Sequence, residues 1–394
     1  MGFVGRKTVP LSKEESKKNY EFLRSTQLYF WLQSAMTQPN ANTYCSKLFA
    51  EAPQAKEAVQ GKLAVVTGVT IGGAGFQMAQ ELALSAGMSV IIMGRNTKKL
   101  EAAEAAIVAE AQKRGLETPK LYHVAFDLDD LTTAVSAAEA ATKIAKDNYD
   151  GKLHVLVNNA GAAVPDYKLT KQGVEANVGR NFLAPHLLTE KLLTLLKAAS
   201  TPEYKARCVF IASLGHCLTL DLDPDNLLEE PQFGGAPKDY FQFDADGKCT
   251  NDVMSINLMY GRGKHGDVAS AYHMAKLYPE VNFTSQQPGS IVSNFGNALG
   301  AVGMVYYYGF WLFQYSPSQG AVTALRCALD PDFNTEAGLQ GAYIHADGNP
   351  WWLDDLRIDD PDTQKPYDWD KYSKKVYDNA NALIEKLLKQ TDAV

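Results

Sequence analysis

The sequence feature that most constrains the fold is the glycine-dense stretch Lys62–Gly75. It begins with Leu63–Val66, a short and wholly apolar run of the kind found in strands buried on both faces of a parallel sheet. The turn Thr67–Gly75 follows, and Phe76–Ala86 then shows the apolar spacing of a helix. Glycines let a backbone approach a phosphate closely, and the start of a helix offers free N–H groups. The stretch therefore predicts a phosphate-binding turn between a strand and a helix.

From residue 61 the chain alternates short apolar runs with helical patterns. The predicted strands are Leu63–Val66, Ser89–Met93, Lys120–Phe126, Leu153–Val157, Cys208–Ala212, Val281–Gln286 and Ala342–His345, and the later helices are Lys98–Lys113, Leu131–Lys146, Val174–Ala198, Ala269–Leu277 and Ser318–Asp330. This alternation predicts an α/β fold with a doubly wound parallel sheet of Rossmann type, in which ligands bind beyond the carboxyl ends of the strands. We expect residues 61–350 to form this domain. An N-terminal extension (1–60), an insertion (218–266) and a C-terminal extension (351–394) with a terminal helix, Lys371–Lys389, complete the chain.

Composition narrows the class of function. A net charge of −7 and a pI near 5.6 argue against nucleic acid as a partner. The five cysteines form no Cys-x-x-Cys pair, so we expect neither a disulfide framework nor a metal site. We find no signal peptide and no apolar run long enough to span a membrane, and we expect the cytosol or a membrane surface facing it, with an organelle left open. The apolar segment Glu21–Met36 suits a helix packed on the domain, with peripheral membrane contact as the alternative.

The end of the second predicted strand indicates which dinucleotide the chain binds. At this point an acidic residue holds the free ribose hydroxyls of NAD, whereas a basic residue accommodates the 2′-phosphate of NADP. Here the strand runs out as Gly94-Arg95-Asn96, with no acid. Arg95 carries a planar guanidinium suited to a phosphate. We therefore predict NADP(H) as the cofactor, with an ordinary surface arginine as the alternative interpretation.

A tyrosine and a lysine four residues apart supply candidate proton-transfer chemistry. Tyr272 and Lys276 would share one face of a helix, where the ammonium lowers the pKa of the phenol. Such a phenol can exchange a proton with a carbonyl or alcohol oxygen while a hydride moves to or from a nicotinamide. Ser213 directly follows the fifth predicted strand, where its hydroxyl could hold the reacting oxygen.

With these residues the chain resembles the short-chain dehydrogenase/reductase family, and most closely its retinol-dehydrogenase-type branch. The resemblance covers roughly residues 60–350 and rests on motifs in the family's order: Thr67–Gly75, Gly94-Arg95-Asn96, Asp127-Leu128, Asn158-Asn159-Ala160-Gly161, Asn177, Ser213-Leu214-Gly215-His216, Tyr272 with Lys276, and Pro288-Gly289. It implies Tyr272 as the acid/base and Lys276 as both a modulator of its pKa and a ribose ligand. It also implies that Ser213 holds the substrate oxygen and that Asn177 holds a relay water.

The resemblance further implies which residues surround the cofactor. They are Gly68, Thr70, Ile71, Gly73, Gly75, Arg95, Asn96, Asp127, Leu128, Asn159, Ala160, Gly161, Tyr272, Lys276, Pro288 and Gly289. The glycine turn is one residue longer than the family's usual pattern, which makes Gly68, Gly73 and Gly75 the expected equivalents. The pair Asp127-Leu128 is implied to contact the adenine.

The apolar and aromatic segment Ala298–Tyr315 falls where that branch covers its substrate. An exposed segment of this kind beside a site suits an apolar substrate or a membrane surface. Retinoids, steroids and lipid aldehydes or ketones are therefore the predicted substrate classes, with core packing as the alternative role for the segment.

The segment after Lys276 departs from the family. Only 12 positions separate Lys276 from Pro288, and they include the strand Val281–Gln286. The helix Ala269–Leu277 would rise roughly 13 Å, against roughly 20 Å for a six-residue strand, so the crossover is barely long enough. This leaves the family's usual homodimer open and favours a second hypothesis, a non-catalytic cofactor-binding scaffold. Retention of all four implied catalytic residues favours the enzyme, and a light-dependent tetrapyrrole reductase is a less attractive third hypothesis.

Overall fold

The structure is a computed structural model of the 394-residue chain. It describes residues 38–164, 166–217, 222–251, 253–292, 314–335, 339–346, 348, 350–351 and 368–392. The predicted helix within Glu21–Met36 and nearly all of the segment Ala298–Tyr315 lie outside the described residues.

One eight-stranded sheet organises the described part of the chain, in the order β3-β2-β1-β4-β5-β6-β7-β8. The strands are β1 (Leu63–Thr67), β2 (Ser89–Gly94), β3 (Leu121–Ala125), β4 (Val155–Asn158), β5 (Arg207–Ile211), β6 (Asn282–Gln286), β7 (Tyr343–Ile344) and β8 (Pro350–Trp351). The first seven pair in parallel, and β8 pairs with β7 in the antiparallel sense. The strand order reverses between β1 and β4, which makes their carboxyl ends the switch point of a doubly wound sheet. The predicted fold class is confirmed.

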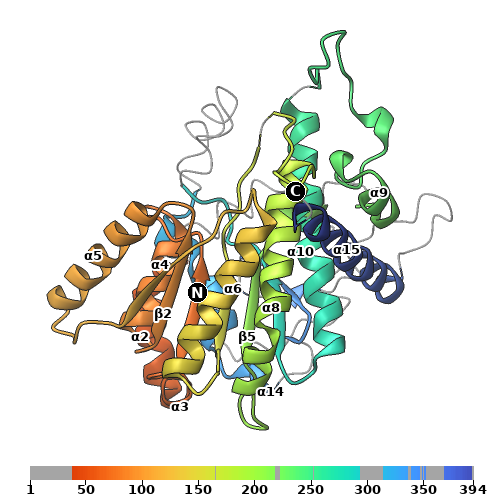
Figure 1. Cartoon of the computed structure of the whole chain (residues 1–394). Coiled ribbons are helices and arrows are strands. Elements are labelled where there is room, and N and C mark those ends of the chain that lie inside the picture. The colour runs from red at the N-terminus through yellow and green to blue at the C-terminus, as the bar shows by residue number, and fades with distance from the viewer. Residues whose placement is uncertain are drawn as a thin grey trace.

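Helices cover both faces of this sheet (Figure 1). Their bounds are α2 (Ala41–Glu51), α3 (Pro53–Glu57), α4 (Ala74–Leu84), α5 (Thr97–Lys113), α6 (Leu131–Asn148), α7 (Ala176–Val178), α8 (Ala184–Ala199), α9 (Pro224–Glu229), α10 (Val253–Leu277), α12 (Pro317–Gly320), α13 (Val322–Leu329), α14 (Asp332–Thr335) and α15 (Trp369–Asp392). Side chains alternate along each strand, so Leu63 and Val65 join a core with α6, α8, α10 and α15, whereas Ala64 and Val66 join one with α2, α4, α5 and α13. Two separate apolar layers thus hold the sheet.

Two predicted element boundaries need correction. The helix predicted over Val174–Ala198 is divided into α7, a π-helix at Gly179–Leu183, and α8. Residues 253–266, which were predicted to lie in the insertion, form the first half of α10. With 25 residues, α10 spans roughly 37 Å, ample for a return crossover to β6.

The terminal helix α15 belongs to the same core as the sheet. Its apolar side chains, among them Trp369, Val376 and Leu383, are buried in the layer that contains α8 and α10. Tyr377 Oη donates a hydrogen bond to Glu190 of α8 at 2.9 Å, which fixes the helix from its polar edge. Figure 1 shows α15 lying across α10, beside α9. The predicted terminal helix is confirmed, and it forms part of the domain.

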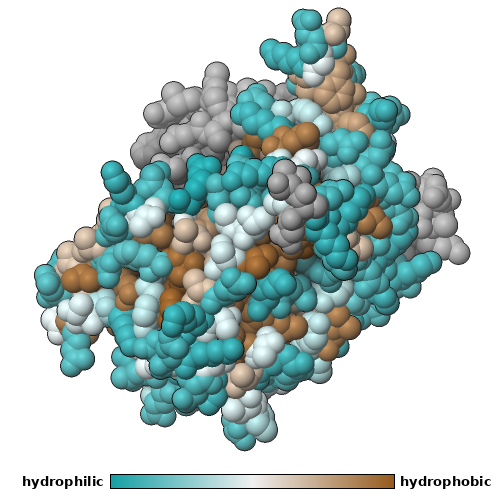
Figure 2. Space-filling view, viewed as in Figure 1, coloured by the Kyte–Doolittle hydropathy of each residue, from teal (hydrophilic) through white to brown (hydrophobic). Residues whose placement is uncertain are grey.

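The surface is mixed. On the face shown in Figure 2, hydrophilic residues predominate and the apolar residues lie in several separate patches between them. Among the described helices, none is both long enough and apolar enough to cross a membrane.

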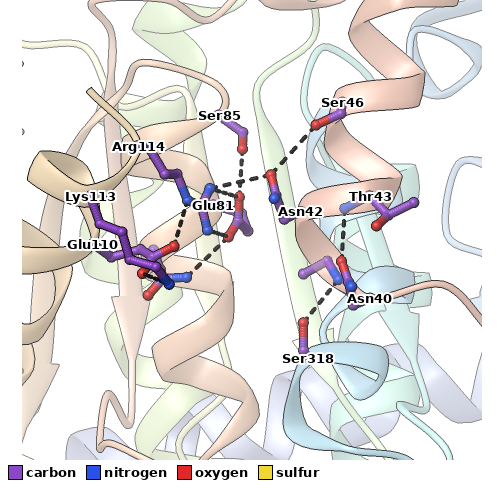
Figure 3. Close-up of polar contacts among 12 residues, drawn as sticks. Asn40, Asn42, Thr43, Ser46, Glu81, Ser85, Glu110, Lys113, Arg114 and Ser318 are labelled. Atoms are coloured by element: carbon purple, nitrogen blue, oxygen red, sulfur yellow. Dashed lines mark hydrogen bonds and ion pairs between the residues drawn. The ribbon is translucent and has the colours of Figure 1, made fainter. Parts of the chain in front are cut away.

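A buried carboxylate joins three helices on the α4 face (Figure 3). Glu81 of α4 is 1% exposed and accepts two hydrogen bonds from Arg114, Nη1 to Oε2 at 3.0 Å and Nη2 to Oε1 at 2.8 Å. Arg114, at the end of α5, also donates to Glu110 and to Asn42 of α2. These contacts raise the pKa of the Arg114 guanidinium, and the hydrogen bond that it donates to Glu81 is the largest cause. A charge buried at Glu81 is therefore acceptable only while Arg114 is present.

We expect Arg114→Met to lower the free energy of unfolding by about 3–5 kcal/mol, because it leaves the Glu81 carboxylate buried without its cationic partner. The matched control is Lys113→Met, which removes a cation from the same helix end, where the lysine side chain is 78% exposed. The control should cost less than about 0.5 kcal/mol. Urea unfolding of both variants measures the difference, and equal losses would contradict this account of the network.

Candidate active site

The turn after β1 and the segment after β4 pack directly against each other at the carboxyl edge of the sheet. Gly68 adopts a φ of +74°, and a Cβ on it would lie 2.7 Å from Ala160 Cα. A Cβ on Gly75 would overlap Asn159 Nδ2. Gly73 is the N-cap of α4, and no side chain of this cap binds the first N–H groups of the helix, the groups that a phosphate would use. The structure thus brings together the predicted glycines and the predicted segment Asn159–Gly161.

Hydrogen bonds hold these two loops in register. Ala160 N donates to Thr67 Oγ1 at 2.8 Å, and Asn159 Nδ2 donates to Thr67 O at 2.9 Å. A Cβ on Gly161 would lie 2.8 Å from Asn181 Oδ1 and 3.3 Å from Lys264 Nζ. The segment therefore links the glycine turn to residues of the π-helix and of α10.

A cavity of about 200 Å³ opens at the end of β2. Its lining residues are Val69, Thr70, Gly94, Arg95, Asn96, Lys99 and Leu100. Thr70, Arg95 and Asn96 were predicted, whereas Lys99, in the first turn of α5, was missed. Asn96 also caps α5, since its side chain accepts from Lys99 N at 3.2 Å. Ile71, in the turn beside this cavity, is 48% exposed.

Two further predicted segments lie at the same edge. Asp127 and Leu128 follow β3, where Asp127 N donates to Thr133 Oγ1 at 3.0 Å. Pro288 and Gly289 follow β6, and Gly289 has a φ of +81° against the ring of Tyr315. The carboxyl ends of β1 to β6 thus gather every predicted cofactor segment except the pair Tyr272 and Lys276.

Ser213 meets a different tyrosine and lysine from those predicted. Ser213 follows β5 and makes a hydrogen bond with Tyr260 of α10. One turn further along α10, Lys264 Nζ donates to Ile211 O at 2.7 Å and lies 6.0 Å from the centre of the Tyr260 ring. Lys264 is 4% exposed. The buried ammonium is thereby held beneath the loop that carries Ser213.

Electrostatics of this cluster act on the Tyr260 phenol in both directions. Burial is the largest effect and raises its pKa. The ammonium of Lys264 and the hydrogen bond with Ser213 lower that pKa, and the carboxylate of Asp267 raises it. A phenol placed beside a serine hydroxyl and an ammonium can donate a proton to a bound carbonyl oxygen or accept one from an alcohol.

The structure places the predicted pair, Tyr272 and Lys276, at the opposite end of α10. Tyr272 Oη donates to Asp370 Oδ1 at 2.7 Å, and Lys276 forms an ion pair with the same carboxylate. A Cβ on Gly341, just before β7, would lie 3.5 Å from Tyr272 Cα. The neighbouring Gln340 donates to Ala275 O at 3.1 Å. Tyr272 and Lys276 therefore lie near the amino ends of β6 and β7 and do not meet Ser213.

The physical reason for this correction is that α10 carries two Tyr-x-x-x-Lys pairs twelve residues apart. Twelve residues rise roughly 18 Å and turn the helix through about 120° beyond three full turns. The length of the crossover to the next strand was the signal in the sequence that could have identified the correct pair. From Lys264 to Pro288 there are 24 positions instead of 12, so choosing Tyr260 removes the apparent shortening.

Asn177 is fully buried, and its side chain is bound by the backbone of Val164 and the carboxylate of Glu175. Its Oδ1 accepts from Val164 N at 2.8 Å, and its Nδ2 donates to Val164 O and Glu175. Its carbonyl accepts from Asn181 Nδ2 at 2.8 Å. Asn181, which sequence reasoning missed, is the side chain that faces Gly161 beside Lys264. The role of Asn177 in holding a relay water stays a prediction.

Comparisons with known proteins agree with this fold, which is that of a dinucleotide-binding α/β domain. Residues 62–217 match the family model described as short chain dehydrogenase. An uncharacterised oxidoreductase of Schizosaccharomyces pombe is 30% identical over 292 residues, covering 73% of this chain and 77% of that protein. The polyprenol dehydrogenase of Homo sapiens is 27% identical over 289 residues, covering 72% and 76%. The chain belongs to the short-chain dehydrogenase/reductase family, whose members are oxidoreductases that bind NAD(P).

Solved structures show the same fold at lower identity. A crystal structure of an uncharacterised protein from Mycobacterium paratuberculosis superposes with a TM-score of 0.53 and 18% identity, covering 83% of this chain and 94% of that one. L-sorbose reductase from Gluconobacter frateurii gives a TM-score of 0.50 with 15% identity, covering 74% and 97%.

We expect Gly68→Ala to weaken NAD(P)H binding by at least roughly ten-fold, because its Cβ pushes against Ala160 and opens the turn. The matched control is Gly61→Ala, whose φ of +73° is equally strained but whose Cβ meets no atom within 4 Å. Both variants should lose about 1–2 kcal/mol of stability from backbone strain. Fluorescence titration with NAD(P)H separates them, and unchanged binding in Gly68→Ala would argue against the close approach.

Proposed function

We propose that the chain is an NADP(H)-dependent oxidoreductase that interconverts an apolar alcohol and its carbonyl compound, with Ser213, Tyr260 and Lys264 as its catalytic residues. The observation that carries this proposal is the hydrogen bond between Ser213 and Tyr260 at the carboxyl edge, with Lys264 buried one turn away. A tyrosine with a purely structural role would not need both a serine hydroxyl and a buried ammonium beside it at the edge of the sheet where ligands bind.

Each residue has a distinct task in this proposal. The Ser213 hydroxyl donates to the substrate oxygen and orients it toward Tyr260. The Tyr260 phenol gives its proton to that oxygen during reduction and takes one back during oxidation. The Lys264 ammonium favours the phenolate, and it lies beside Gly161, where the nicotinamide ribose would be held. When bound, the nicotinamide supplies or accepts the hydride.

Two cations support a preference for NADP(H) over NAD(H). Arg95 and Lys99 both line the cavity after β2, and no acidic residue is among its lining residues. An acid there would hold the ribose hydroxyls of NAD, whereas a guanidinium and an ammonium suit a 2′-phosphate. We therefore assign the 2′-phosphate of NADP(H) to this cavity.

An aromatic cluster supports an apolar substrate. It consists of Tyr167, Phe233, Tyr240, Phe241 and Phe243, with ring centres 5.1–6.4 Å apart. Most of these residues belong to the insertion, and Tyr240 lies over the guanidinium of Arg262, two residues after Tyr260. One relative is named for action on a polyprenol, a long isoprenoid alcohol. Isoprenoid alcohols therefore join retinoids, steroids and lipid aldehydes or ketones as candidate substrates.

The scaffold hypothesis loses the observation on which it rested. It depended on a short helix after Lys276, whereas α10 has 25 residues and the pair Tyr260 and Lys264 leaves a full crossover. The resemblance to the retinol-dehydrogenase branch and the homodimer stay predictions.

We expect Tyr260→Phe to lower kcat about 10²- to 10⁴-fold, because it removes the proton donor. The matched control is Tyr272→Phe on the same helix, which should change kcat less than about two-fold because that hydroxyl contacts Asp370. NADPH oxidation with a panel of retinal, a steroid ketone, an aliphatic aldehyde and a polyprenal provides the assay. Loss of turnover in Tyr272→Phe alone would overturn the assignment.

We expect Arg95→Ala to weaken NADPH binding about 10- to 100-fold and to leave NADH binding unchanged. Hydrogen bonds to charged groups contribute about 1.5–3 kcal/mol, which corresponds to this range. Lys98→Ala is the control, since Lys98 belongs to the same turn but is not among the cavity's lining residues. Titration of each variant with both nucleotides measures the preference. Equal losses for NADH and NADPH would count against the 2′-phosphate assignment.

A further inference from the structure

An aspartate lies beside Lys264, the lysine of the proposed catalytic cluster. Asp267 follows Lys264 by three residues on α10, and Lys264 Nζ donates to Asp267 Oδ2 at 3.0 Å. The two side chains are 5% and 3% exposed. With the carbonyl of Ile211, this carboxylate occupies two of the three hydrogen-bonding directions of the ammonium. The ammonium also lies close to Gly161, where a Cβ would be 3.3 Å from Lys264 Nζ.

The carboxylate of Asp267 is bound by Lys264 alone among the contacts of the described residues. Its other oxygen, Oδ1, is buried without a hydrogen-bond partner there. Burial raises the pKa of this carboxyl to about 7, and Lys264 opposes that rise. A buried carboxylate with one partner is costly, so its presence beside a catalytic ammonium calls for a functional explanation.

We propose that Asp267 is a positioning residue that fixes the Lys264 ammonium and, by offsetting its charge, sets the pH at which Tyr260 exchanges its proton. This inference rests on the proposed function. The ammonium alone would pull the phenol toward the phenolate, and the carboxylate opposes that pull. The phenol is therefore kept protonated over a wider pH range, which favours proton donation and hence carbonyl reduction.

Other titratable groups face α10 from the elements around it. Among them are Cys208 on β5, His186 on α8, Glu175 before α7, His216 in the turn after Ser213, and Asp370, Tyr372 and Tyr377 on α15. Burial lowers the pKa of His186 and His216 to about 4 each, so both are neutral near and above pH 7. Burial raises the pKa of the Cys208 thiol, which is therefore also neutral there. Asp267 is thus the carboxylate that bears on Lys264 directly.

The decisive variant is Asp267→Asn, which keeps an oxygen for Lys264 and removes the negative charge. The ionisation of Tyr260 is followed by the near-ultraviolet absorbance of tyrosinate as the pH rises, with NADP⁺ bound. The spectrum of the same protein carrying Tyr260→Phe is subtracted, so that the difference reports Tyr260. We expect Asp267→Asn to lower the pKa of Tyr260 by about one unit, the size of effect that a neighbouring charge has. The pH at which alcohol oxidation levels off should fall by the same amount.

The matched control is Asp370→Asn, which removes a carboxylate from beside the other Tyr-x-x-x-Lys pair of α10 and should leave the Tyr260 titration in place. A Tyr260 pKa that stays or rises in Asp267→Asn would overturn the proposal. The absorbance titration needs no turnover, so it tests the role of Asp267 even if none of the substrates is reduced. The proposed function is tested separately by turnover of the substrate panel. Thermal unfolding and NADP⁺ titration establish that both variants are folded, and Asp267→Glu, which restores the charge, should restore the original titration.

Discussion

The close approach of the turn after β1 to the segment after β4 is the constraint on which the rest of the site depends. Gly68 leaves no room for a side chain beside Ala160, and Thr67 and Asn159 bind each loop to the other. Because the strand order reverses between β1 and β4, this contact lies at the switch point of the sheet. It also brings Gly161 close to Lys264, so the glycine turn and the proposed catalytic cluster are joined through one short segment.

Helix α10 carries the proposed acid/base residues, and its position relative to the sheet decides which of its two Tyr-x-x-x-Lys pairs lies at the carboxyl edge. It runs from the carboxyl ends of the strands toward their amino ends. Lys264 is buried against the carbonyl of Ile211, whereas Lys276, with 46% of its side chain exposed, pairs with Asp370 of α15. The same Tyr-x-x-x-Lys pattern thus occurs in a desolvated site and on a solvated edge. Desolvation strengthens electrostatic interactions, so only the buried pair is suited to tune a phenol.

The sheet could be predicted from the sequence because its strands are short apolar runs, such as Ser89–Met93, whose pattern has few alternatives. The edge at which the cofactor is expected could also be predicted, because the polar motifs directly follow the predicted strands. The first half of α10 could not be predicted from the sequence, because Gly261, Gly263 and Gly266 give residues 253–266 a low helix propensity. Tertiary packing explains two of these glycines: a Cβ on Gly263 would press on the carbonyl of Asn177, and one on Gly266 would overlap the Phe182 ring. Packing of this kind is invisible in a single sequence, and it hid Tyr260.

The most direct test of the central claim is a crystal structure of the chain with NADP⁺ bound. This account predicts the nicotinamide ring beside Ser213 and Tyr260, with the pyrophosphate over the turn at Gly68 and the 2′-phosphate between Arg95 and Lys99. A nicotinamide bound next to Tyr272, or a dinucleotide held away from the carboxyl edge of the sheet, would contradict it.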